Sequence, residues 1–174
     1  GDNSLILIVL PTIDLPIIEK EAFPLFGIIV MDKEEDNDDT FPVESLANAL
    51  KVLNYDGNFF LINSDTWISS NLKDFSNATP PCIGILFQEE TKRYGIVEVS
   101  EDYQITSFKE KSISSNSGFI NSGLYLLNSE LFLDWDESPC SLEEIYLNKF
   151  VEQGILSGVN LEASFIDIGV PKDY

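Results

Sequence analysis

The chain has 174 residues, and 30 Asp and Glu against 10 Lys and Arg give it a formal charge of −20 at pH 7. This charge repels nucleic acids and anionic membrane surfaces, so both classes of partner are excluded. A hydrophobic content of 44% excludes the disordered acidic proteins. The chain contains no histidine, which excludes Ser-His-Asp and Cys-His catalysis and His-bound zinc or iron. Its chemistry must therefore rest on carboxylates, lysines and hard metal ions.

The length favours one domain over residues 1–174 with a core of its own. Cys82 and Cys140 lie far apart, which indicates two buried small hydrophobes, and a disulfide only if the protein is exported. No apolar run reaches the roughly 20 residues of a transmembrane helix, and residues 1–4 lack a signal-peptide pattern, so we expect a cytoplasmic protein. The chain lacks a first Met and stops at Pro171–Tyr174 as if a helix were beginning. We therefore expect it to be incomplete at both ends.

The first third of the chain alternates between strand and helix patterns. Ser4–Leu10 is an uninterrupted apolar run, typical of a strand buried on both faces. We predict a short helix over Asp14–Phe23 and a second strand over Gly27–Met31. Val43–Leu53 has the apolar spacing of one helix face, and Asn58–Ile62 is another buried strand. This order predicts a wound α/β sheet with right-handed crossovers.

An acidic run follows the second predicted strand. Asp32–Asp39 contains seven charged residues in eight, and we interpret it as a solvated loop. A calcium site is the alternative, although the run lacks the glycine and the closing glutamate of an EF-hand loop.

The rest of the chain predicts a different section of the sheet. Four strands with short polar links indicate mixed or antiparallel pairing: Cys82–Phe87, Tyr94–Val99, Gln104–Phe108 and Phe119–Leu127. Ser141 and Glu144 form a capping box at the start of a helix that Gly154 ends. The apolar residues predicted for its buried side are Leu142, Ile145, Leu147, Phe150 and Val151. Two short strands follow, over Ile155–Val159 and Ala163–Ile168.

Five fragments in order carry a family resemblance: Phe60–Thr66, Tyr94–Val97, Ile105–Lys111, Asn121–Leu127 and Phe165–Tyr174. They resemble the Asn-Gly-Asp, Tyr-Gly-Val, Phe-x-Glu-Lys-Pro, Asn-x-Gly-Ile-Tyr and Asp-Ile-Gly-Thr-Pro motifs of the sugar-phosphate nucleotidyltransferases. The chain is most similar to the bacterial branch that handles hexose or heptose 1-phosphates. The resemblance implies a GT-A or Rossmann-like fold, a mixed and mostly parallel wound sheet with helices on both faces. It also implies transfer of a nucleotidyl group from a nucleoside triphosphate to a sugar 1-phosphate.

The chain departs from the family at the nucleotide phosphates. The family's first strand leads into a Gly-Gly-x-Gly-Thr-Arg-Leu loop, but here all ten glycines are isolated and the only arginine is Arg93. The register indicates that Ser4–Leu10 corresponds to the family's second strand, so the first strand-loop-helix unit lies outside this chain or is absent. The next nucleotide contact falls on Ser45–Asn48, where two glycines are replaced. Because the family's first strand lies inside the sheet, we expect either a rearranged sheet or pairing of an exposed edge with a second copy.

The resemblance implies that Asp65 and Asp167 share one Mg²⁺ ion. Each follows an apolar strand, a position that a turn or helix cap also explains. Nucleotidyl transfer needs charge neutralisation and positioning, which Mg²⁺ on carboxylates and lysines supply. A divalent cation would also help this acidic chain to admit a polyanion.

For the sugar phosphate, the resemblance implies Lys111 as the catalytic phosphate contact. Glu110 and Asn121 would bind sugar hydroxyls, and Gly95 and Gly123 would offer backbone amides. The alternative is that residues 108–111 are a solvated strand end. Tyr94 and Tyr125 are interpreted as core aromatics with hydrated hydroxyls rather than sugar platforms.

These residues leave more than one function open. The first hypothesis is a sugar 1-phosphate nucleotidyltransferase, inactive as this chain stands, with sugar 1-phosphate and nucleoside triphosphate as partners. The second is a degenerate, non-catalytic relative that binds sugar phosphates as a regulatory subunit. A glycosyltransferase of similar fold is a third, weaker option, because no Asp-x-Asp motif that suits it follows a strand.

Overall fold

The computed structural model describes the main chain of residues 5–11, 27–33 and 167. It describes main chain and side chains of residues 43–63, 66–69, 75, 77–92, 94–109, 117–136, 138 and 140–166. The predicted helix over residues 14–23 and the acidic run beyond Lys33 lie outside the described residues.

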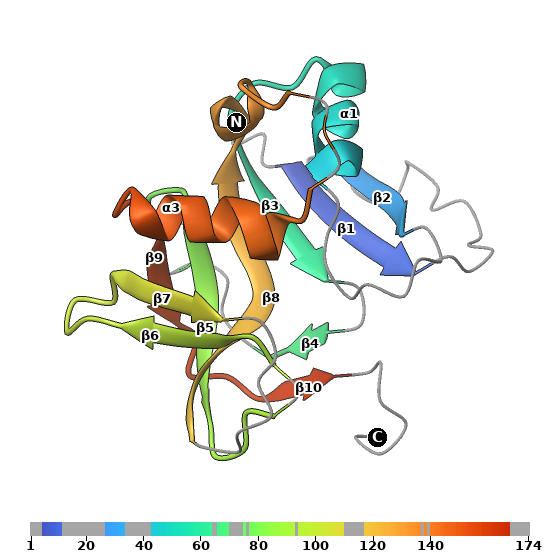
Figure 1. Ribbon diagram of the computed structural model, residues 1–174. Coiled ribbons are helices and arrows are strands. Elements are labelled where there is room, and N and C mark those ends of the chain that lie inside the picture. Colours follow the sequence, from blue (N-terminus) through green and yellow to red (C-terminus); the bar gives the residue numbers. More distant parts are fainter. Residues whose placement is uncertain are drawn as a thin grey trace.

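Three parallel strands and one helix form the first part of the fold (Figure 1). They are β1 (Leu5–Pro11), β2 (Gly27–Lys33), α1 (Val43–Leu53) and β3 (Asn58–Asn63). β1 lies between β2 and β3 and is parallel to both, with Leu7 opposite Ile29 and Leu61. The predicted α/β arrangement is confirmed. β2 runs two residues beyond the predicted Met31, so Asp32 belongs to a strand and not to the acidic loop.

The second part of the sheet is largely antiparallel, as predicted. It contains β5 (Cys82–Gln88), β6 (Ile96–Val99), β7 (Ile105–Lys109), β8 (Gly118–Asn128) and β9 (Ser157–Asn160). The order continues β3-β8-β5-β9, and β6 pairs with both β7 and β8. Only β5 and β9 are parallel among these pairs. β4 (Thr66–Ile68), which sequence analysis did not predict, and β10 (Phe165–Asp167) form a separate antiparallel pair.

The last helix begins as predicted and buries most of the predicted face: Leu142, Leu147 and Phe150 are buried, and Val151 packs against the same cluster. A short 3-10 helix, Ser129–Phe132, precedes it, and the helix itself runs as a π-helical segment, Leu142–Leu147, and then as α3 (Asn148–Glu152). The Ser141 hydroxyl accepts from the Glu144 amide at 3.1 Å, which confirms the cap. Ile145, predicted to be buried, is 52% exposed, whereas Glu143 is only 6% exposed. Glu143 and Tyr146 extend the buried face that Leu142, Leu147 and Phe150 form, because residues three and four apart share a side of the helix.

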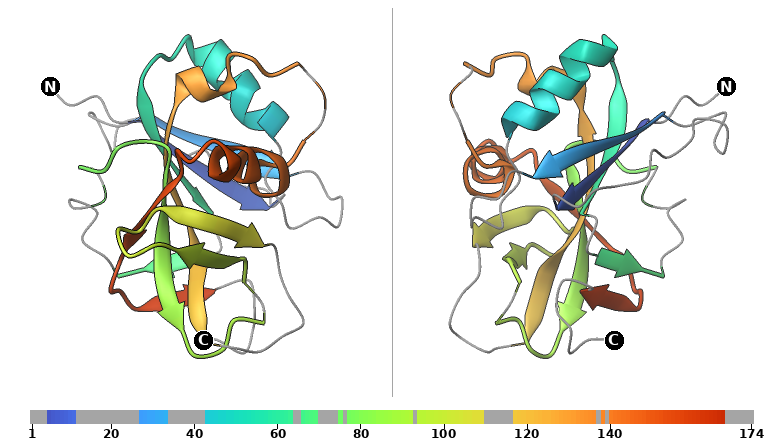
Figure 2. Two further views of the ribbon diagram at one scale, coloured as in Figure 1. Left: turned by 60° about the vertical axis from the view of Figure 1, so that its left-hand side comes forward. Right: turned by 90° about the vertical axis from the view of Figure 1, so that its right-hand side faces the viewer.

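The sheet separates two hydrophobic clusters, so β3 is covered on both faces. Phe59 and Leu61 pack in the first cluster together with residues of α1 and of the last helix. Phe60 and Ile62 point the other way and pack against the second cluster. The second cluster contains Phe75, Cys82, Leu86, Ile120, Leu124, Leu126 and Leu161. Figure 2 shows the sheet together with α1 and α3 from two further directions.

β1 and β3 pair directly over five residues, from Leu5 opposite Phe59 to Val9 opposite Asn63. The described sheet therefore has no unpaired edge between these two strands. A rearrangement of the sheet relative to the family stays a prediction. Association with a second copy of the chain stays a prediction.

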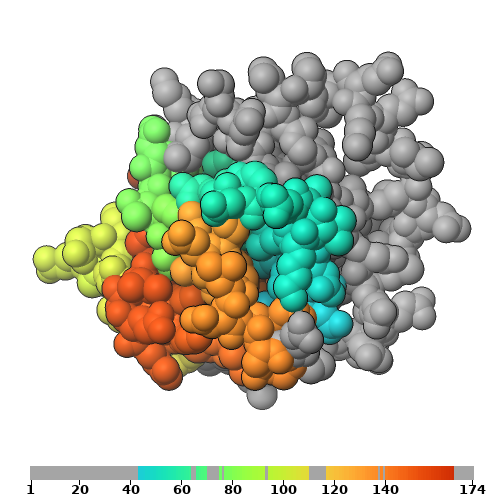
Figure 3. All heavy atoms as spheres, turned by 90° about the horizontal axis from the view of Figure 1, so that it is seen from above, coloured from blue at the N-terminus to red at the C-terminus, as the bar shows by residue number. Residues whose placement is uncertain are grey.

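At one end of the molecule, α1 contacts the segment that follows β8. Figure 3 looks down on this end, where α1 lies beside the orange segment that follows β8. The Lys51 ammonium lies over the Trp135 ring, 5.3 Å from its centre. None of the helices in the described part is long and apolar enough to span a bilayer.

The two cysteines are free and lie in different environments. Cys82 is fully buried in β5, and burial raises the pKa of its thiol to about 12. This confirms the interpretation of Cys82 as a small hydrophobe. Cys140 is only half-buried, although desolvation raises the pKa of its thiol as well.

The end of β3 packs against β8 at a glycine. Gly123 has a φ of +73°, and a Cβ built on it would lie 2.8 Å from Nδ2 and 3.0 Å from Cβ of Asn63. Only glycine adopts this backbone conformation without strain and also leaves room for the Asn63 side chain. Gly123 therefore determines how closely the carboxyl end of β3 approaches β8.

Replacing Gly123 by alanine is expected to destabilise the fold more than the same change at Gly154. Both residues have similar positive φ angles, but nothing lies within 4 Å of a Cβ built at Gly154. Gly154→Ala should lose about 1 kcal/mol of unfolding free energy from backbone strain alone. Gly123→Ala should lose about 1–3 kcal/mol more, because the strand end must move. Urea unfolding followed by circular dichroism measures both values, and equal losses would contradict the close approach.

Candidate functional site

Three of the residues predicted to bind the sugar lie together beside the end of β3. The backbone N–H of Asn121 donates to the backbone carbonyl of Gly95 at 2.9 Å. The Gly123 amide donates to Oδ1 of the Asn121 side chain at 3.1 Å. We call Gly95, Asn121 and Gly123 the sugar-side cluster. Polar groups at the carboxyl ends of strands are where open α/β sheets place their ligand sites.

Some polar groups of this cluster bond to one another. The Gly123 amide, predicted to face a substrate, is bonded to Asn121. Gly95 contributes its carbonyl to the contact with Asn121. The half-buried Asn121 side chain keeps one Nδ2 hydrogen and one Oδ1 lone pair beyond its bonds within the described residues.

A buried hydrogen-bond chain continues from Asn121 into the core. Nδ2 of Asn121 donates to the Tyr125 hydroxyl at 2.8 Å, and this hydroxyl donates to Oε1 of Glu143 at 3.1 Å. Tyr125 is fully buried, which confirms it as a core aromatic. The predicted hydrated hydroxyl is wrong, because the hydroxyl is held inside by Asn121 and Glu143.

Glu143 was missed because an acidic residue was not considered for the inner face of the last helix. The spacing of Glu143, Tyr146 and Phe150 contains the signal, since residues three and four apart share a helix face. The carboxylate is held from two sides, by the Tyr125 hydroxyl and by the Ser141 hydroxyl at 3.4 Å from Oε2.

One predicted metal ligand, Asp167, lies opposite the residue that follows the other in the sequence. Asp167 in β10 is the register partner of Thr66 in β4, and Asp65 immediately precedes Thr66 in the sequence. The side chain of Asp167 and the whole of Asp65 lie outside the described residues. Among the described residues, no three acidic, cysteine or histidine side chains are close enough to hold a metal ion.

An aromatic contact joins the sugar-side cluster to the β4–β10 pair. The Tyr94 ring, next to Gly95 in sequence, meets the Phe165 ring edge-on with 5.4 Å between ring centres. Phe165 lies two residues before Asp167 in β10. The loop before β6 is therefore held against the strand that ends at the predicted metal ligand (Figure 1).

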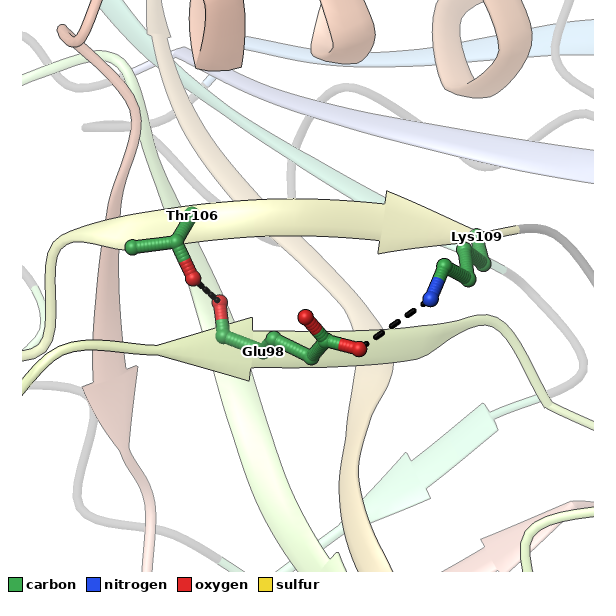
Figure 4. A network of polar contacts seen from close by, with 3 residues as sticks. All are labelled: Glu98, Thr106 and Lys109. Atoms are coloured by element: carbon green, nitrogen blue, oxygen red, sulfur yellow. Dashed lines mark hydrogen bonds and ion pairs between the residues drawn. The ribbon is translucent and has the colours of Figure 1, made fainter.

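Glu110 and Lys111 lie outside the described residues, and the described strand stops at Lys109. The Lys109 ammonium pairs with the Glu98 carboxylate at 3.1 Å, and the Thr106 hydroxyl donates to the Glu98 carbonyl at 3.1 Å (Figure 4). Both charged side chains are largely exposed, so the pair contributes little to stability. Lys109 thus behaves as a solvated strand residue, which leaves the roles of Glu110 and Lys111 as predictions.

The segment that resembles a nucleotide contact lies within α1. Leu46 and Ala47 are buried in the core, and the first amide of α1, that of Val43, donates to the carbonyl of Cys140 at 2.9 Å. This end of α1 is therefore anchored to the loop before the last helix.

Comparisons with known proteins agree with the geometry. The family model for nucleotidyl transferases matches residues 26–174. The chain is 32% identical over 117 residues to D-glycero-alpha-D-manno-heptose 1-phosphate guanylyltransferase of Campylobacter jejuni, covering 66% of this chain and 52% of that protein. It is 32% identical over 151 residues to mannose-1-phosphate guanyltransferase of Kluyveromyces lactis, covering 78% of this chain and 42% of that protein. The chain thus spans about half, or less, of the length of these curated relatives.

A solved structure shares the fold. The crystal structure of HddC from Yersinia pseudotuberculosis complexed with GMP-PN superimposes with a TM-score of 0.66 at 29% sequence identity. The alignment covers 86% of this chain and 64% of that chain. The predicted mixed α/β fold and the predicted family are therefore both confirmed. Since the family match takes in most of its residues, the chain belongs to the nucleotidyl transferase family.

Proposed function

We propose that this chain forms the sugar-phosphate side of a guanylyltransferase site that takes a hexose or heptose 1-phosphate of manno configuration. The observation that carries the proposal is the meeting of the sugar-side cluster with the β4–β10 pair beside the end of β3. The relatives named above, which are mannose- and manno-heptose-1-phosphate enzymes, support the substrate class.

In the proposed reaction, an oxygen of the sugar 1-phosphate attacks the α-phosphorus of GTP. The new phosphorus–oxygen bond forms as the bond to pyrophosphate breaks, and pyrophosphate leaves. Positioning and charge neutralisation are the protein's main contributions to such a transfer. Asn121 would hold sugar hydroxyls from the floor of the site, and Glu110 would accept from others. Lys111 would hold the attacking phosphate.

The residues at the β4–β10 pair suit a magnesium ion. Mg²⁺ binds carboxylate oxygens and keeps several of its waters, so two aspartates are a sufficient protein ligand set. Asp167 pairs with Thr66 in the β4–β10 ladder, and Thr66 is the residue that follows Asp65 in the sequence. When bound, the ion would neutralise phosphate charge that the net charge of −20 otherwise repels. Asp65 and Asp167 would hold it.

Mg²⁺ binding is expected to be lost in Asp65→Asn and in Asp167→Asn, because each change removes one of two anionic ligands. Isothermal titration calorimetry with MgCl₂ measures the binding directly. Asp102→Asn is the charge-matched control, since Asp102 is exposed in the β6–β7 turn and its carboxylate accepts from Ser100. Unchanged binding in both test variants would count against the shared ion.

A non-catalytic sugar-phosphate-binding role is the second candidate, and one sequence feature favours it. None of these 174 residues forms the glycine-rich loop that would hold the nucleotide phosphates. A Gly-Gly-x-Gly-Thr-Arg segment encoded upstream of Gly1 would favour the enzyme over this role.

The 174-residue chain by itself is expected to release no pyrophosphate from GTP and α-D-mannose 1-phosphate. It should nevertheless bind the sugar phosphate, because the sugar-side cluster is formed within it. A coupled pyrophosphate assay measures turnover and a calorimetric titration measures sugar-phosphate binding, both on the same preparation with MgCl₂. Measurable turnover would show that the phosphate-loop argument is wrong, and absence of sugar-phosphate binding would contradict the proposed site.

A further inference from the structure

The Asn121 side-chain amide is held by a different group at each end. A backbone N–H can only donate, so the atom of Asn121 that faces the Gly123 amide must be Oδ1. Nδ2 faces the Tyr125 hydroxyl, which accepts from it. The same hydroxyl has one hydrogen, and it donates that hydrogen to Glu143. The direction of each bond in this series therefore agrees with its two ends, the donor at Gly123 and the acceptor at Glu143.

Glu143 accepts the last bond of this hydrogen-bond series and lies in the core. Glu143 is 6% exposed and belongs to the first turn of the last helix, whose start is capped by Ser141. The Ser141 hydroxyl lies 3.4 Å from Oε2 of Glu143. A buried acceptor without a donor is costly, so Glu143 keeps the Tyr125 hydroxyl turned toward itself.

We infer that Tyr125 and Glu143 are positioning residues that hold the Asn121 amide in one orientation for a pair of neighbouring sugar hydroxyls. The inference rests on the proposed function and specifies how its sugar side recognises a ligand. The free Nδ2 hydrogen donates to one hydroxyl and the free Oδ1 lone pair accepts from the next. A vicinal diol of a pyranose presents this pair, whereas an isolated hydroxyl satisfies only half of the amide.

Substitutions separate this role from simple core packing. Tyr125→Phe keeps the ring and removes the acceptor for Nδ2. Glu143→Leu keeps the bulk and removes the acceptor for the Tyr125 hydroxyl. Glu143→Gln keeps a carbonyl oxygen that can accept from Tyr125, so it should preserve the orientation although it removes the charge.

The first measurement needs no ligand. In ¹H–¹⁵N spectra of the full chain, the two Asn121 side-chain amide protons should exchange at different rates, since one is bonded to Tyr125 and the other is not. Tyr125→Phe should make the rates similar, Glu143→Leu should reduce the difference because the Tyr125 hydroxyl loses an acceptor that orients it, and Glu143→Gln should keep the difference. Matched controls are Tyr103→Phe and Glu144→Leu, because both residues are exposed and lie outside the chain of bonds. An unchanged Asn121 signal in Tyr125→Phe would overturn the inference.

The second measurement is calorimetric binding of α-D-mannose 1-phosphate. Tyr125→Phe and Glu143→Leu should weaken binding about tenfold, the cost of roughly one misplaced hydrogen bond. Glu143→Gln should bind within about twofold of the unaltered chain. A deoxy analogue of mannose 1-phosphate that lacks one of the two neighbouring hydroxyls bonded to Asn121 should bind the unaltered chain and Tyr125→Phe with similar, weak affinity.

The outcomes distinguish the inference from the proposed function. If the unaltered chain binds no sugar phosphate, the proposed function fails, while the exchange rates still test the hydrogen-bond chain. If the exchange rates change as expected but sugar-phosphate affinity does not, the positioning role is overturned. If Tyr125→Phe does not fold, the comparison of Glu143→Gln with Glu143→Leu carries the same test.

Discussion

The close approach of Asn63 to Gly123 is the constraint on which the site depends. A Cβ at residue 123 would lie within 3.0 Å of the Asn63 side chain, so the two strands meet there only because the residue is glycine. The approach places the carboxyl end of β3 over the middle of β8. From there, one hydrogen-bond chain runs from the Gly123 amide through Asn121 and Tyr125 to Glu143. The site is thus tied to both the sheet and the last helix.

The sugar-side cluster and the predicted metal ligands belong to two different parts of the fold. The sugar-side cluster is built on a central strand and buried partners, which is how a binding geometry is kept rigid. The predicted metal ligands instead belong to, or precede, a short two-stranded pair outside the main sheet. The contact of Tyr94 with Phe165 joins the two. A rigid sugar side beside a smaller pair that carries the predicted metal ligands suits a reaction in which positioning provides most of the catalysis.

Sequence reasoning predicted the regular elements well, because hydrophobic periodicity and caps determine them. α1 has the predicted bounds, and Ser141 caps the last helix as expected. It could not predict β4, whose three residues are too few for a pattern, and it was wrong about Ile145, which is exposed, while Leu142, Leu147 and Phe150 are buried as expected. Local spacing places Glu143 on the side of Tyr146 and Phe150, but it does not reveal the tertiary partner, Tyr125, that bonds to this carboxylate. The expectation that Asp65 and Asp167 lie close together came from motif resemblance and not from periodicity.

Paramagnetic broadening by Mn²⁺ in the presence of α-D-mannose 1-phosphate tests the central claim most directly, namely that one cation and the sugar phosphate share a site. Mn²⁺ replaces Mg²⁺ at oxygen ligands and broadens nearby nuclear signals. The account predicts strong broadening of the bound sugar's ³¹P signal and of the Gly95 and Gly123 amides, with both effects abolished in Asp65→Asn. Broadening confined to other parts of the chain, or unaffected by that substitution, would contradict the account.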